Sequence, residues 1–223
     1  MESPVLRGDG NGVYRIRLVG NSGMFYSTLG SRLSKIMSIP WIPLDQVYWR
    51  PGWEKCTNDD FKARIRAAMH TDECKRGWII DGNYNSHGSV VADEEATDII
   101  CLSPGSYSLV AGCLTGVPGL DPPFLSYFPG LVLRTFRRLL GIEPTCAVGC
   151  TESWRETFFS TKSIIWWCIT THKKMQVRAQ KWMETMALEK GGNMRRIGSR
   201  EELERWVSDV ERLVGGEGTV TGR

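Results

Sequence analysis

The 223-residue sequence has little of what identifies several common classes of protein. It has three histidines and a net charge of only +3 at pH 7, and a charge this small does not indicate a nucleic-acid or membrane partner. The balance is uneven, because residues 1–133 carry −2 and the remainder carries +5. With 41% hydrophobic and 24% charged residues, the composition excludes wholesale disorder and fibrous classes. We therefore expect one globular domain.

Signals for export, for a metal centre and for a membrane span are also missing. The first residues, MESPVLRGDGNG, contain no apolar signal region, so we expect a reducing, cytoplasmic compartment. Of seven cysteines only Cys146 and Cys150 are closely spaced, and His172 is the only downstream histidine, so free thiols are favoured over a zinc site. Residues 99–120 carry no charge, but glycines and prolines interrupt them, so we expect no membrane span.

The first half of the sequence alternates between strand-like and helix-like segments. β-branched or apolar runs alternate with segments that have apolar residues at helical spacing. The predicted strands are 14–19, 77–80 and 99–102, the predicted helices are 27–37 and 59–69, and a short apolar run covers 39–44. This alternation is typical of an α/β fold with a parallel sheet.

The second half is less regular. Residues 103–130 hold five glycines, five prolines and one charge, so we predict an atypical surface loop or poorly ordered insertion, with helical pattern resuming at Leu131. Residues 153–186 are consistent with one long or two shorter helices, and 195–197 with a short last strand. Ser199 starts a capping box for a final helix. We predict one domain over 14–214, with flexible ends at 1–13 and 215–223.

The turn after the first strand resembles a phosphate-binding loop, whose pattern is G-x-x-x-x-G-K-[ST]. The chain reads Gly20-Asn21-Ser22-Gly23-Met24-Phe25-Tyr26-Ser27-Thr28. Phe25 replaces the second glycine, and a left-handed backbone there would cost about 1–2 kcal/mol. Tyr26 replaces the lysine, which removes a charge-assisted contact worth about 1.5–3 kcal/mol. The alternative is an ordinary tight turn between strand and helix.

Four longer strings carry a resemblance to a known family. They are Arg15-Ile-Arg-Leu-Val-Gly-Asn-Ser-Gly23, Ile39-Pro-Trp-Ile-Pro-Leu-Asp-Gln-Val-Tyr-Trp-Arg-Pro-Gly-Trp53, Gly77-Trp-Ile-Ile-Asp-Gly-Asn-Tyr84 and Arg134-Thr-Phe-Arg-Arg138. With them the chain resembles the topology-modulation-protein group of P-loop kinase-like proteins, which are related to adenylate kinases. The resemblance covers 14–102 and, more loosely, 131–214. It implies a three-layer α/β P-loop NTPase sandwich with a parallel sheet.

The resemblance also implies roles for individual residues. Asp45 would face a phosphoryl acceptor or assist the metal, and Asp81 would hold Mg²⁺ together with Ser27. The phosphates would be bound by Gly20, Asn21, Ser22, Gly23, Tyr26, Ser27 and Thr28, and the moving phosphoryl group by Arg134, Arg137 and Arg138, which share a helix face by spacing. The alternatives are aspartates that cap turns and a solvated basic helix face.

The expected function follows from these roles. The resemblance implies a nucleoside-triphosphate-binding protein that uses ATP and Mg²⁺ and descends from phosphotransferases acting on a nucleotide or small molecule. Loss of the loop glycine and lysine predicts impaired catalysis. The alternatives are a non-catalytic binding or scaffold protein that kept the fold, and a nucleic-acid-binding protein that uses its basic C-terminal half.

Overall fold

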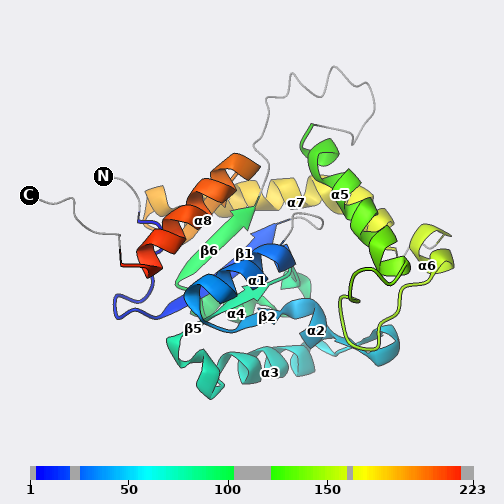
Figure 1. Ribbon diagram of the computed structural model, residues 1–223, viewed down its shortest axis with the longest axis horizontal. Helices are drawn as coiled ribbons and strands as arrows, with labels where there is room; N and C mark the ends of the chain where they lie inside the picture. Colours follow the sequence, from blue (N-terminus) through cyan, green and yellow to red (C-terminus); the bar gives the residue numbers. More distant parts are fainter. Residues whose placement is uncertain (1–3, 21–25, 103–121, 160–162, 217–223) are drawn as a thin grey trace, which may run out of the picture.

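A five-stranded parallel sheet forms the centre of the protein (Figure 1), in a computed structural model that describes residues 4–20, 26–102, 122–159 and 163–216. The strand order is β2-β5-β1-β6-β7, and every pairing in this sheet is parallel. The strands are β1 (Tyr14–Gly20), β2 (Trp41–Pro43), β5 (Gly77–Asp81), β6 (Asp98–Leu102) and β7 (Met194–Ile197). A small antiparallel pair, β3 (Trp49–Arg50) and β4 (Glu54–Lys55), lies apart from it.

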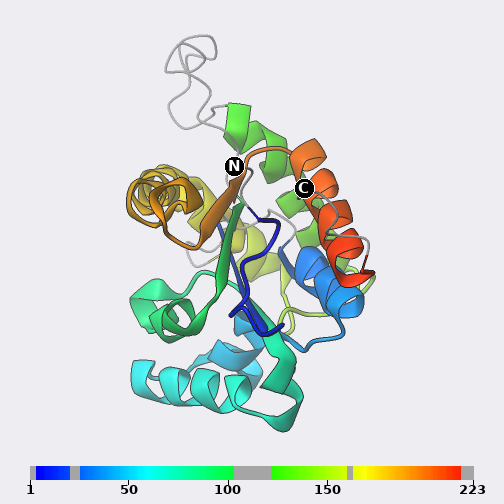
Figure 2. The ribbon, with the colours of Figure 1, turned by 90° about the vertical axis from the view of Figure 1, so that its left-hand side faces the viewer.

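Helices cover both faces of the sheet, which gives three layers. Figure 2 shows α1 and α8 on one side of the strands and α4 and α7 on the other. The α-helices are α1 (Tyr26–Met37), α2 (Leu44–Tyr48), α3 (Asn58–Met69), α4 (Val90–Glu95), α5 (Pro122–Leu139), α6 (Trp154–Phe159), α7 (Ile164–Met186) and α8 (Arg200–Val214). Short 3₁₀ segments cover Pro51–Trp53, Asp72–Arg76, Asn85–His87 and Leu188–Lys190. The predicted α/β class with a parallel sheet is confirmed.

Alternation along the central strand divides the core in two. Ile16 and Leu18 of β1 are buried in the cluster that contains Leu33 of α1 and Val207 of α8. Val19 belongs to the other cluster, which includes residues of α3, α4 and the second half of α7. Because successive side chains of a strand point to opposite faces, an apolar strand such as β1 serves both helical layers.

One charged side chain lies fully buried among these apolar residues. Arg17 of β1 has no exposed surface. Its Nε donates to Asp93 Oδ1 of α4 at 2.8 Å, and its two terminal nitrogens donate to the carbonyl oxygens of Leu18 at 3.0 Å and Gly82 at 2.6 Å. A second bond of Nη2, to Ser89 Oγ, is 3.4 Å long. The guanidinium therefore links the sheet, α4 and the turn that follows β5.

Most predicted elements are confirmed within one or two residues of their ends. These are the strands at 14–19, 77–80, 99–102 and 195–197 and the helices at 27–37 and 59–69. The capping box is also confirmed, because Ser199 Oγ accepts from the Glu202 amide at 3.1 Å. Residues 153–186 form two helices, and Ser163 caps the second by accepting from the amide of Trp166.

The prediction of a loop up to residue 130 is wrong for 122–130. Helix α5 begins at Pro122 and contains Pro129. Prolines suit the first helical position because its N–H has no partner inside the helix, and a proline inside a helix removes one hydrogen bond without preventing the turns around it. Residues 103–121 lie outside the described part of the chain.

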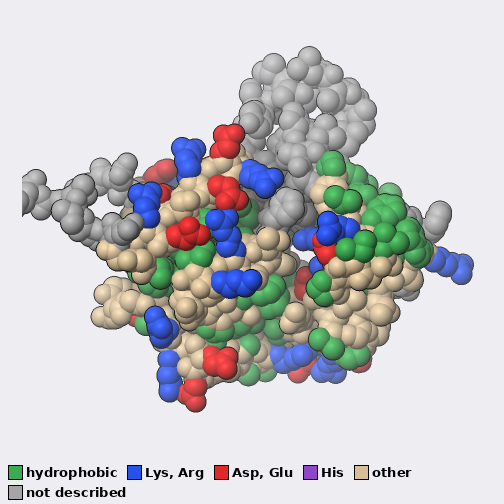
Figure 3. Space-filling view, in the orientation of Figure 1, with side chains coloured by type: hydrophobic (Ala, Val, Ile, Leu, Met, Phe, Trp, Pro, Cys, Tyr) green, Lys and Arg blue, Asp and Glu red, His purple; other side chains and the backbone are tan. Residues whose placement is uncertain are grey.

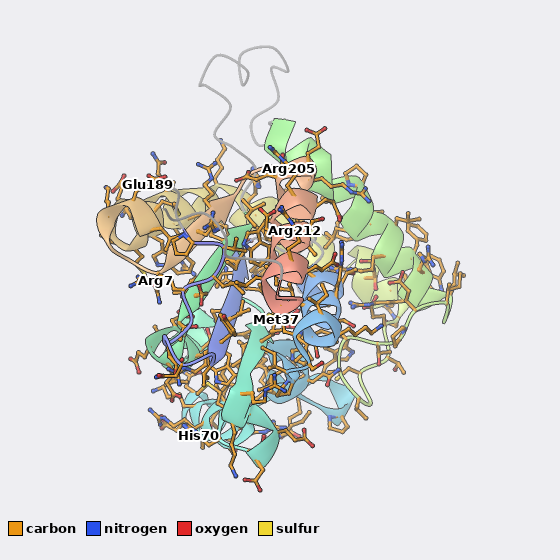
Figure 4. The ribbon with its side chains drawn as sticks, turned by 60° about the vertical axis from the view of Figure 1, so that its left-hand side comes forward. Arg7, Met37, His70, Glu189, Arg205 and Arg212 are labelled. Carbon is orange, nitrogen blue, oxygen red and sulfur yellow. The ribbon has the colours of Figure 1, made fainter. Side chains whose placement is uncertain are left out.

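The described residues before β1 make specific contacts with β6 and α8. Leu6 is buried, and the amides of Arg7 and Gly8 donate to the two carboxylate oxygens of Asp98 at 2.7 and 3.0 Å. Trp206 of α8 donates its indole N–H to the carbonyl oxygen of Val5. Figure 4 shows Arg7 on the same side of the molecule as Glu189, near the turn after α7.

Two kinds of surface are visible in Figure 3. Hydrophobic side chains gather over α5 and the segment after it, whereas Lys, Arg, Asp and Glu are interspersed over α8 and α1. The exposed apolar residues of this part of the chain are Leu133, Phe136, Leu140, Ile142, Val148 and Trp154. In the described residues, no helix is both long enough and apolar enough to cross a membrane.

Replacing Arg17 tests how far the fold depends on its buried guanidinium. We expect Arg17→Met to lower the free energy of unfolding by about 3–5 kcal/mol, because it leaves Asp93 without its cation in a buried place. Urea unfolding followed by circular dichroism measures this. Arg32→Met is the matched control, because Arg32 pairs with Glu204 and Glu211 on the surface and should cost less than about 1 kcal/mol. Equal losses in the two variants would contradict the central role of Arg17.

Candidate functional site

The carboxyl ends of β1, β2 and β5 meet at one edge of the sheet. The register places Asp81 of β5 beside Leu18 of β1 and Pro43 of β2. After β1 the chain first builds β2 and β5 on one side of that strand and then crosses to β6 on its other side. In open α/β sheets, ligands bind outside the carboxyl ends of the strands where such a reversal occurs. This edge is therefore the candidate site.

Asp81 ends β5 and is almost completely buried. Burial, followed by the negative charge of Asp45, raises the pKa of its carboxyl group to about 7, although Arg17 and the hydroxyl of Ser27 act in the opposite direction. Ser27 lies in the first turn of α1. The structure thus brings together Ser27 and Asp81, the two residues predicted to hold a metal ion.

Asp45 reaches the same edge from the start of α2. Its Oδ1 accepts a hydrogen bond from the hydroxyl of Tyr84 at 2.5 Å, and Tyr84 in turn accepts one from Nε1 of Trp49 at 3.1 Å. The charge of Asp45 affects the pKa values of Asp81, Tyr84, Arg134 and Cys146, which are contributed by different elements. Asp45 is therefore the carboxylate around which the site is arranged.

The three predicted arginines do not point the same way. Arg137 is about half exposed and pairs with Glu143 at 2.9 Å. Arg138 is more buried and pairs with Glu152 at 3.6 Å. Arg134 lies one turn before Arg138, and its pKa is lowered by burial and by Arg138 while the charges of Asp45, Glu143 and Glu152 oppose that change. Spacing predicted a common face, but only Arg134 and Arg138 are turned towards the protein.

The phosphate-loop residues are placed only in part. Asn21, Ser22 and Gly23 lie outside the described residues. Gly20 ends β1, and its carbonyl oxygen accepts from Nδ2 of Asn83 at 3.2 Å. Tyr26 is the first residue of α1, and Thr28, two residues on, is exposed. The described part of the loop therefore places Ser27, not Thr28, beside Asp81.

Several polar residues of this region were not predicted as site residues. Tyr84 and Asn83 follow Asp81 directly in the string Asp81-Gly-Asn-Tyr84, so their signal was present. Glu152 and Cys146 precede α6 and carried no motif. Burial, followed by the charge of Asp45, raises the pKa of the Cys146 thiol to about 12. Among the described residues, three buried polar atoms here have no hydrogen-bond partner: Asn83 Oδ1, Arg138 Nε and Glu152 Oε2.

The donor set fits a magnesium ion better than a softer metal. Ser27, Asp45 and Asp81 offer a hydroxyl and two carboxylates, and Mg²⁺ is usually bound by one or two carboxylates together with water and substrate phosphates. No group of three or more His, Cys, Asp or Glu side chains that could hold a metal by itself occurs in the part of the chain that is described. Ser27 and Asp81 are the residues of this edge that could hold such an ion.

The fold defines the chain as an α/β protein with a parallel central sheet between helical layers and a polar site at the carboxyl edge of β1, β2 and β5. Comparisons with known proteins add no narrower class. Neither a scan against protein-family models nor a search of curated proteins finds a match for this chain.

The raised pKa of Asp81 predicts a pH dependence of stability. An aspartate in the unfolded chain titrates near 3.8, whereas folded Asp81 holds its proton up to about pH 7. Between these values the folded state binds more protons, so the free energy of unfolding falls as pH rises. For Asp81 alone the fall from pH 5 to pH 8 should be about 2–3 kcal/mol.

Urea unfolding of the native chain and Asp81→Asn at pH 5, 6, 7 and 8 measures this fall. The variant should lose the part due to Asp81 and keep the smaller part due to Asp93 and Glu152, whose pKa values burial also raises. Asp45→Asn is the matched control, because removing its charge should shift the fall to lower pH without abolishing it. Parallel curves for the native chain and Asp81→Asn would contradict the prediction.

Proposed function

We propose that this chain binds a nucleoside triphosphate with Mg²⁺ at the carboxyl edge of β1, β2 and β5, and that it descends from adenylate-kinase-like phosphotransferases. The observation that carries the proposal is the meeting of Ser27, Asp81 and Asp45 at that edge, where the chain order reverses around β1. Three separate elements contribute one oxygen donor each. Such a set suits a hydrated divalent cation that also binds phosphate oxygens.

The position of α1 supports the phosphate part of the proposal. The helix begins at Tyr26, six residues beyond Gly20, and the N–H groups at a helix N-terminus favour a phosphate by partial positive charge and hydrogen bonding. When bound, Mg²⁺ would neutralise phosphate charge near Ser27 and Asp81. Asp81 would have to give up its proton at neutral pH to act as a ligand, which makes metal binding weaker below about pH 7.

The position of Arg134 supports the proposed descent from enzymes that transfer a phosphoryl group. It is turned inward from α5 and is close enough to Asp45 for that charge to favour the protonated guanidinium. An arginine that approaches the phosphates can stabilise the charge on a transferred phosphoryl group. Tyr26 in place of the loop lysine removes one cation from the site, so transfer should be slower than in a chain with an intact loop.

The face formed by α8 and α1 favours a nucleotide over a nucleic acid. Two of its basic residues are paired with acids: Arg32 with Glu204 and Glu211, and Arg212 with Asp209. Figure 4 places Arg205 and Arg212 on α8, and Figure 3 shows positive and negative side chains mixed over this face. A nucleic-acid surface needs a patch of one sign.

Calorimetry with Mg·ATP tests the proposed binding directly. Phe25→Gly/Tyr26→Lys should bind Mg·ATP about 10-fold to 100-fold more tightly than the native chain, because it restores a charge-assisted contact worth about 1.5–3 kcal/mol. Asp81→Asn added to this double variant should remove the dependence on Mg²⁺. No gain in affinity in the double variant would refute the proposal. Tight binding without any phosphoryl transfer would favour the non-catalytic alternative.

Arg134 and Arg137 of α5 provide a matched pair of variants that tests phosphoryl transfer. In the loop-restored chain, Arg134→Ala should lower the rate of ATP turnover about 100-fold or more, because an arginine that stabilises transferred charge makes a contribution of at least that size. Arg137→Ala should change it less than about twofold, because Arg137 pairs with Glu143 on the outer side of the helix and such surface pairs contribute little. Steady-state ADP release measures both. Equal effects would contradict the assignment of Arg134.

A further inference from the structure

Tyr84 lies between Trp49 and Asp45 in a chain of two hydrogen bonds. The indole Nε1 of Trp49 donates to the Tyr84 hydroxyl at 3.1 Å, and that hydroxyl donates to Oδ1 of Asp45 at 2.5 Å. Nothing in the resemblance assigned a role to Tyr84. Tyr84 lies within the site, because its partner Asp45 is close enough to Asp81, Arg134 and Cys146 for its negative charge to act on all three.

The donor inventory determines the direction of both bonds. An indole nitrogen can only donate, whereas a phenol has one proton and two lone pairs. Because Trp49 occupies a lone pair of Tyr84, the single hydroxyl proton is available for Asp45, and Oδ1 of Asp45 accepts it. Trp49 therefore orients Tyr84, and Tyr84 orients Asp45.

The ring of Tyr84 is held on several sides. It lies 4.7 Å from the ring of Tyr48 and 5.5 Å from that of Phe61, measured between centroids. The turn that precedes it is held by Arg17, which donates to the carbonyl oxygen of Gly82 at 2.6 Å. A hydroxyl on a ring fixed in this way has little freedom to follow a moving carboxylate. It therefore sets where the Asp45 carboxylate can lie.

Asp45 and Asp81, the two acids of the site, have different surroundings. Asp81 is buried at the end of β5, whereas Asp45 is partly exposed and accepts a hydrogen bond from the hydroxyl of Tyr84. Pairs of carboxyl groups whose surroundings differ in this sense take different chemical roles. The titratable groups that face Asp45 are Asp81 from β5, Tyr84 from the turn after it, Arg134 from α5, and Cys146 from the segment before α6.

We propose that Tyr84 is the positioning residue for Asp45, holding Oδ1 so that Oδ2 receives the proton of the phosphoryl acceptor. This rests on the proposed function. In the step concerned, the acceptor hydroxyl gives its proton to Oδ2 while its oxygen forms a bond to the γ-phosphorus of ATP. The bond from that phosphorus to the β,γ-bridging oxygen breaks, and this oxygen leaves with the electron pair as part of ADP.

The test compares Tyr84→Phe with Tyr48→Phe in the full-length loop-restored chain, with water as the acceptor. Both variants remove one phenol hydroxyl from the same aromatic cluster, but only Tyr84 contacts Asp45. Tyr84→Phe should lower kcat for ATP hydrolysis about 10-fold and leave KM for Mg·ATP within twofold. Tyr48→Phe should change none of these values.

Two outcomes would overturn the proposal: a fall in kcat of similar size in both variants, or no change in Tyr84→Phe. A measurement that needs no nucleotide keeps it separate from the proposed function. The carboxyl ¹³C chemical shift of Asp45, assigned with Asp45→Asn, should change in Tyr84→Phe, which removes the hydroxyl bonded to Oδ1, and should stay at its native value in Tyr48→Phe. If Mg·ATP does not bind, the proposed function fails. If this resonance is unchanged, the positioning role fails.

Discussion

The buried guanidinium of Arg17 is the interaction on which the rest of the structure depends. It lies inside an otherwise apolar layer and is stabilised by Asp93 and by backbone carbonyl groups from both sides of the β1–β5 pair. A buried cation without these partners would cost several kcal/mol, so this side chain couples the stability of the sheet, α4 and the turn after β5. This turn carries Gly82, Asn83 and Tyr84 to the candidate site.

The candidate site follows from the geometry of a parallel sheet. Carboxyl ends of neighbouring strands meet at one edge, so Asp45 after β2, Asp81 at the end of β5 and Ser27 after β1 come close together although they are far apart in the sequence. Their surroundings then make them different. Asp81 is desolvated, which raises the pKa of its carboxyl group to about 7, whereas Asp45 receives a hydroxyl donor from Tyr84. Asp45 and Asp81 carry the same functional group, and their different surroundings give that group different properties.

Sequence patterns predicted the regular elements well and the side-chain arrangement less well. β1 was recognised from its alternating, β-branched pattern and β6 because buried parallel strands are short apolar runs, and Ser199 marked the start of α8 by its capping pattern. Helix α5 was predicted to start too late, because the cost of proline was assigned without regard to its position. Arg137 was grouped with Arg134 by spacing, although the helix turns it outward to Glu143. Tyr84 was part of a recognised string, but its bond to Asp45 depends on how β2 and β5 pair.

By itself the sequence determined the α/β class, the order of most strands and helices along the chain, and the aspartates that follow β2 and end β5, because periodicity and capping are local properties. It also determined that the loop after β1 lacks a glycine and a lysine. Only the tertiary structure decided which strand lies beside which, that Arg17 is buried and paired, and that Tyr84 connects Trp49 to Asp45. These facts depend on contacts between residues far apart in the chain, and local patterns carry no information about such contacts.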